Sequence, residues 1–62
     1  MCDSNAYLLK NGTEELVMEN VDYVRLDGDT VVMRNIFGEE QTFEATLQEM
    51  NLTGHKILMK SI

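Results

Sequence analysis

The sequence has no proline, no tryptophan, one cysteine and no run of apolar residues longer than four. A single cysteine excludes a disulfide within the chain. The short apolar runs argue against a membrane-spanning helix and against the apolar centre of a signal peptide. Basic residues are also scarce, because five Lys and Arg stand against eleven Asp and Glu, which gives a net charge of −6. Such a chain repels phosphate backbones, so binding to nucleic acid is disfavoured.

The length of 62 residues indicates one small domain over residues 1–62. A domain of this size hides only about 60% of the surface that its unfolded chain exposes, so its core is marginal. Without disulfides, a bound metal or a second subunit is the remaining source of added stability. The chain is too short to enclose the active-site cleft of an enzyme. Its sequence also has no nucleophile–base pair and no phosphate-binding loop motif. We therefore expect a cytoplasmic protein that is not an enzyme and whose thiol stays reduced.

Glycines with polar neighbours divide the chain into short segments rich in β-branched and aromatic residues. Asn11-Gly12 and Asp27-Gly28 are typical of two-residue type I′ hairpin turns, in which both central residues have positive φ. Gly38 and Gly54 mark two weaker turn signals. Between these turns the sequence predicts about six short strands, over residues 6–10, 13–18, 21–26, 30–36, 41–47 and 55–62.

The side-chain pattern favours an all-β fold, a small SH3-like antiparallel barrel that conceals its strand edges. Phe43, Ala45 and Leu47 alternate with polar residues, so their strand has one face toward solvent. Between Tyr23 and Val24 the apolar side chains switch from one face of the strand to the other, as they do at a β-bulge. Residues 46–51 are expected to form a single helical turn, because apolar residues there stand three apart.

Four segments, residues 7–9, 16–18, 31–33 and 57–59, place apolar side chains on both faces of a strand. A chain of this length has one core to fill, so the second apolar face needs a cover. A second copy of the chain across a two-fold axis is the simplest cover. This pattern predicts a homodimer.

Cys2 is the first candidate for chemistry, because nothing in the neighbouring sequence explains it as a packing residue. A thiolate combined with nitrogen donors in a plane favours Ni(II) or Cu(II) over Mg or Ca. The amide nitrogen of Cys2 and the terminal amine of Met1, if Met1 is retained, are nearby nitrogen donors. Two such termini at a dimer axis would complete one metal site. The alternative, in which Cys2 is an inert small hydrophobic residue, stays open.

Other candidate residues have simpler interpretations. His55 is the only histidine and lies beside a turn, where it either adds a metal ligand or faces water. The methionines after Met1 stand beside aliphatic residues and are interpreted as core. Acidic pairs beside the turns lack calcium-loop spacing and are interpreted as solvated charges. A metal-free alternative also stays open, in which the acidic barrel docks a protein partner or stacks single-stranded RNA bases on its aromatic rings.

The sequence resembles the CooT family of small nickel-binding proteins. The resemblance lies in Met1-Cys2, residues 3–8, the Asn35–Glu39 turn and the Leu52–Ile57 segment. The resemblance covers essentially the whole chain, and Cys2 is its most specific element. It implies a homodimer of SH3-like barrels that binds one Ni(II) through Cys2 at the dimer interface. It also implies a metallochaperone whose client is carbon monoxide dehydrogenase. Related sequences have been described as RNA-binding proteins, a role that the net charge of −6 disfavours.

Overall fold

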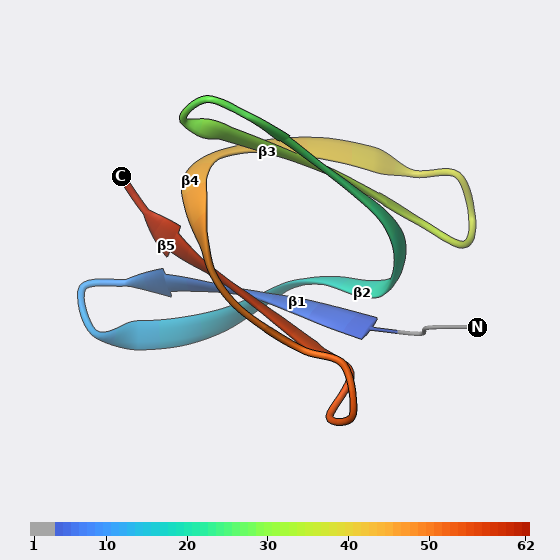
Figure 1. Cartoon of the computed structure of the whole chain (residues 1–62), viewed down its shortest axis with the longest axis horizontal. Helices are drawn as coiled ribbons and strands as arrows, with labels where there is room; N and C mark the ends of the chain where they lie inside the picture. Colours follow the sequence, from blue (N-terminus) through green and yellow to red (C-terminus); the bar gives the residue numbers. More distant parts are fainter. Residues whose placement is uncertain (1–3) are drawn as a thin grey trace.

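The computed structural model describes residues 4–62 and shows five β-strands wound into one closed barrel (Figure 1). The strands are β1 (Ser4–Lys10), β2 (Thr13–Asp27), β3 (Thr30–Asn35), β4 (Glu40–Asn51) and β5 (Lys56–Ser61). Each strand pairs antiparallel with the next one, and β1 pairs parallel with β5 to close the ring. The expected small all-β barrel is confirmed, and the homodimer stays a prediction. Within residues 4–62 no helix has the length and apolar character needed to cross a bilayer.

The strands expected at residues 13–18 and 21–26 form one continuous strand, β2, so the count of six was wrong. The chain bends at Asn20, whose φ of 58° lies in the left-handed region that asparagine tolerates better than most residues. The β2–β3 pairing shifts between Val21 and Tyr23, close to the expected bulge. The bend allows the first half of β2 to pair with β1 and the second half with β3 (Figure 1).

The helical turn expected over 46–51 was also wrong, because β4 continues as a strand to Asn51. Its pairing with β5 shifts between Leu47 and Glu49, and Met50 then lies opposite Ile57. An extra residue in a strand moves the following side chains to the other face. This bulge therefore produces the three-residue spacing of Leu47 and Met50 that imitates a helix.

The two hairpin turns differ in type. Asn11 and Gly12 have φ values of 54° and 79°, which confirms the expected type I′ turn. In the second hairpin Asp27 pairs with Thr30, so the two loop residues are Gly28 and Asp29. Of these only Gly28 has a positive φ, at 62°, which is the type II′ pattern. The type I′ turn expected at Asp27-Gly28 is therefore corrected in both position and type.

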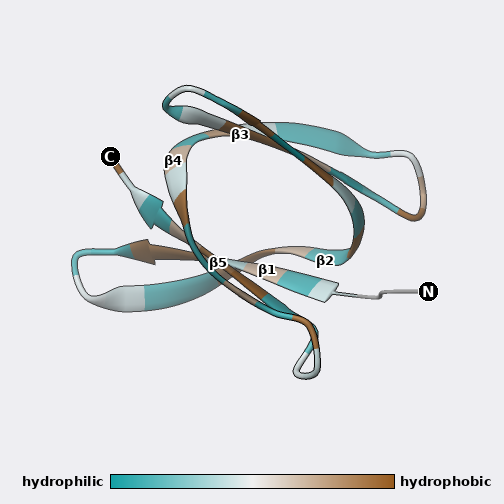
Figure 2. Ribbon diagram, in the orientation of Figure 1, coloured by the Kyte–Doolittle hydropathy of each residue, from teal (hydrophilic) through white to brown (hydrophobic). Residues whose placement is uncertain are grey.

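The core fills the barrel with short aliphatic residues and methionine. Met33 and Met59 have no exposed surface, and Met18 is 6% exposed, which confirms the interpretation of these methionines as core. Met50 is 45% exposed and corrects that interpretation at its position. Figure 2 shows hydrophobic colour within the strands and mostly hydrophilic or neutral colour at the β1–β2 turn. The buried cluster consists of Ala6, Met18, Val21, Val31, Met33, Ala45, Ile57 and Met59.

Two outward-facing apolar residues are already covered within one chain. Val32 lies between the core residues Val31 and Met33 in sequence, yet it is only 5% exposed, as is Leu58. The strand partners of Val32 are Arg25 and Thr42. Long side chains on neighbouring strands can cover apolar surface with their stems. The two-sided pattern of β3 and β5 therefore needs no second copy to explain it.

We expect the Met33→Ala substitution to lower the free energy of unfolding by about 2 to 5 kcal/mol, because it leaves a cavity in the centre of the barrel. Leu26, which is 57% exposed, is the matched control. Its alanine variant should stay within about 0.5 kcal/mol of the parent. Urea unfolding followed by circular dichroism, at one fixed protein concentration, measures both. Equal effects of the two substitutions would contradict the assignment of the core.

Candidate functional site

The start of β1 lies beside the β4–β5 loop. Ser4, the first described residue, is 6% exposed and pairs with Val21. The N–H group of Asn5 donates to the carbonyl oxygen of His55 at 2.9 Å. The structure therefore brings His55, one of the predicted site residues, to the end of the barrel where β1 begins. The other two, Met1 and Cys2, lie outside the described residues.

The β4–β5 loop has its own polar support. The Oδ1 atom of Asn51 accepts hydrogen bonds from Thr53 Oγ1 at 3.0 Å and from the Gly54 N–H group at 2.8 Å. His55 follows with a φ of 54°, and its side chain is exposed. Across residues 4–62 no three His, Cys, Asp or Glu side chains gather as a metal site. His55 therefore offers one exposed imidazole at this end and no complete set of ligands.

Lys56, the first residue of β5, ties this end to the neighbouring strands. Its Nζ atom lies 2.8 Å from Oε1 of Glu14 and 5.1 Å from the centre of the Tyr7 ring. The hydrogen bond to Glu14 raises the pKa of Lys56 above its ordinary value. The ammonium group of Lys56, the residue after His55, thus already has an anionic partner and an aromatic face within the chain.

An apolar hollow of about 220 Å³ opens next to Ser4. Val21, Met50 and Leu52 contribute to its walls, together with Tyr23. Leu52 is 65% exposed, Met50 is 45% exposed and Tyr23 is 38% exposed. Figure 2 shows hydrophobic colour where β4 enters the β4–β5 loop and neutral to hydrophilic colour in the rest of that loop. Exposed apolar side chains grouped around a hollow are typical of an interaction surface, so this end is a candidate for contact with another chain.

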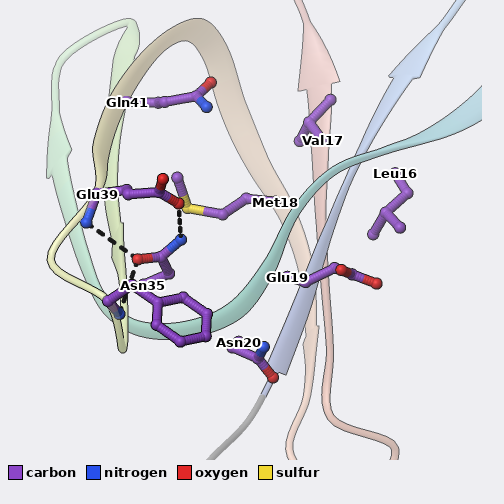
Figure 3. A pocket seen from close by; sticks show the side chains of 9 residues that line it. Leu16, Val17, Met18, Glu19, Asn20, Asn35, Glu39 and Gln41 are labelled. Carbon is purple, nitrogen blue, oxygen red and sulfur yellow. Dashed lines mark hydrogen bonds between the residues drawn. The ribbon is translucent and has the colours of Figure 1, made fainter.

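A second hollow, of about 380 Å³, lies between β2 and the β3–β4 loop (Figure 3). Asn35 organises its loop wall and is only 6% exposed. Its Oδ1 atom accepts from the N–H groups of Phe37 and Glu39, each at 3.0 Å, and its Nδ2 atom donates to Glu39 Oε1 at 2.8 Å. Sequence reasoning placed Asn35 in a turn but missed the role of its side chain. The signal was an asparagine three positions before Gly38, the spacing of the first and last residues of a β-turn.

The family model described as "CO dehydrogenase accessory protein CooT" matches residues 1–60 of the chain. The chain belongs to the CooT family. A solved structure described as CooT from Carboxydothermus hydrogenoformans superposes with a TM-score of 0.88 at 28% identity, over 98% of each chain. A protein of Methanocaldococcus jannaschii, described only as uncharacterized, is 37% identical over 60 residues, which are 97% of this chain and 98% of that one.

Membership of the CooT family confirms the resemblance found in the sequence. The description of the family is that of an accessory protein of CO dehydrogenase, which supports an accessory role in maturation. An accessory role agrees with the expectation that the chain is not an enzyme. In this CooT family member the two hollows lie on different parts of the barrel, one beside Ser4 and one beside Asn35.

We expect Asn35→Ala to release the β3–β4 loop, because the amides of Phe37 and Glu39 both lose their acceptor. A lost acceptor costs about 1 to 3 kcal/mol, so hydrogen exchange at these amides should accelerate about fivefold or more. Asn51→Ala is the matched control, because it removes the same side chain from the β4–β5 loop. It should leave exchange at Phe37 and Glu39 unchanged. Unaltered exchange at both amides in Asn35→Ala would contradict this role.

Proposed function

We propose that this CooT family member is a nickel metallochaperone in which a homodimer carries one Ni(II) between its subunits. The Cys2 thiolates of both copies hold the ion, and nitrogen donors of the same amino-terminal segments complete a planar site. The family assignment over residues 1–60 is the observation that carries the proposal. The client is a nickel enzyme such as CO dehydrogenase, and the transfer takes place in the cytoplasm, where the thiol stays reduced.

The donor set supports a shared site. Residues 4–62 bring no three ligating side chains together, so this part of one copy does not enclose a metal. Two copies that meet near Ser4 would each add a thiolate, since Cys2 stands two residues before Ser4 in the sequence. Soft thiolates with nitrogen donors suit Ni(II), and Cu(II) competes for the same donors. The imidazole of His55 is the additional donor available at this end of the barrel.

The apolar end of the barrel supports the dimer. Tyr23, Met50 and Leu52 expose apolar surface around the hollow beside Ser4. A two-fold axis through this end buries the same side chains on both copies, as an isologous interface requires. The added burial stabilises a chain whose own core is small. In this arrangement, dimerisation and metal binding depend on one another.

We expect Cys2→Ser to abolish nickel uptake in native mass spectrometry of the purified protein titrated with Ni(II) at pH 8. The parent should appear as a dimer with one nickel. Affinity in the variant should fall more than about a hundredfold, since even the loss of a ligand's hydrogen-bonding partner costs about ten- to a hundredfold.

His55→Ala is the matched control for this titration, because it removes the other candidate donor at the same end. We expect it to keep its nickel. Loss of nickel in His55→Ala would make the imidazole a ligand. Full uptake by Cys2→Ser would refute the site and favour a metal-independent interaction module.

We expect Leu52→Ser to weaken the dimer about tenfold or more, because burying one leucine contributes about 1.5 to 3 kcal/mol and about 1.4 kcal/mol is tenfold. Leu26→Ser is the control, since Leu26 is similarly exposed but does not line the hollow beside Ser4. Sedimentation velocity over a concentration series measures both. Nickel bound per chain should fall together with the dimer. An unchanged dimer in Leu52→Ser would place the interface elsewhere.

A further inference from the structure

The hollow between β2 and the β3–β4 loop is negatively charged as well as concave. Glu19 and Glu39 contribute to its walls, with the amide side chains of Asn20 and Gln41. None of the five Lys and Arg residues of the chain lines it. The whole chain also carries a net charge of −6. Local and overall charge therefore both attract a cationic group.

Phe37 adds an aromatic side chain to this hollow. The residue is 72% exposed and takes no part in the buried cluster. Its backbone is fixed, because its N–H group donates to Asn35 Oδ1 at 3.0 Å. The neighbouring N–H group of Ile36 donates to the Asn20 carbonyl at 2.9 Å, which ties the loop to β2. A loop held in this way presents its ring to a ligand at low ordering cost.

The carboxylate of Glu39 is also held in place. Asn35 Nδ2 donates to its Oε1 atom at 2.8 Å, and a carboxylate has a second oxygen that can accept from a ligand. Figure 3 shows the Glu39 and Asn35 side chains together on one wall of the hollow. The hollow therefore has both an anchored carboxylate and an exposed aromatic ring in its lining. An arginine or lysine side chain binds favourably to an anionic partner and to an aromatic face.

We propose that this hollow docks a short segment of a partner protein that carries arginine or lysine. The cationic side chain lies against the Phe37 ring and is bound by the Glu39 carboxylate, and Leu16, which is 45% exposed, receives apolar atoms of the segment. The acidic turns at Glu14-Glu15 and at Asp27–Asp29 contain no aromatic residue. The docking surface does not depend on nickel, because its residues are not those around Ser4.

The test is a titration of the uniformly ¹⁵N-labelled full chain, at low ionic strength, with a short acetylated and amidated peptide of alternating alanine and arginine. A peptide of alternating alanine and glutamate is the control ligand. We expect the arginine peptide to shift the amide signals of residues 16–20 and 35–41, and the glutamate peptide to shift none. Equal shifts at all acidic turns, or no shifts at all, would overturn the proposal.

Two variants localise the contact. Phe37→Ser and Glu39→Gln should each weaken peptide binding about two- to fivefold, since an exposed cation–π contact or charge pair contributes up to about 1 kcal/mol. Glu39→Gln keeps an oxygen that can accept from Asn35, so it removes the charge and preserves the loop. Leu26→Ser and Glu44→Gln are the matched controls and should bind the peptide as the parent does.

The oligomeric state supplies the last outcome. Each variant is also examined by sedimentation velocity without peptide. If Phe37→Ser dissociates the dimer, the hollow is covered by a second copy of this chain and the docking proposal is wrong. Equal peptide affinity in all four variants would overturn it as well. Weaker peptide binding with an unchanged sedimentation coefficient supports it.

Discussion

The parallel pairing of β1 with β5 is the constraint on which the rest of the structure depends. It joins residues 5–9 to residues 56–60, the two ends of the described chain, and so closes the ring. Closure removes the free strand edges that a short chain would otherwise expose to other chains. The same pairing brings the β4–β5 loop beside the start of β1, where Asn5 donates to His55. The candidate metal-binding end is thus a direct result of closing the barrel.

Closing a ring of five strands requires β2 and β4 to bend, and bulges provide these bends. In β2 the bend lies at Asn20, which also lines the acidic hollow. In β4 the pairing shifts after Leu47, and Met50 beyond the shift lines the apolar hollow. The acidic hollow therefore lies at the bend of β2, and the apolar hollow includes a residue just beyond the bulge of β4. The irregular positions of the sheet thus contribute residues to both candidate contact surfaces.

The two hollows have opposite chemistry. The apolar end beside Ser4 suits a second copy of the chain, because identical apolar patches can bury one another across a two-fold axis. The acidic hollow beside Asn35 suits a cationic partner and would repel its own copy. In the function that we propose, the apolar end holds the metal between two copies while the acidic hollow contacts another protein. Under these proposals, assembly and partner recognition use different surfaces of the same small barrel.

The sequence by itself determined the features that depend on neighbouring residues. Asn11-Gly12 specifies its own turn, because both residues tolerate positive φ values. The alternation of apolar and polar residues over 43–47 predicted which face of that strand packs inward. The low content of basic residues limited the partners, and Cys2 was singled out by its chemistry. Tertiary structure decided the continuity of β2, the strand end of β4, the buried amide of Asn35 and the position of His55. These features depend on pairings between residues far apart in the chain. A bulge also moves the following side chains to the other face of a strand, and in the sequence this looks the same as a strand end or a helical turn.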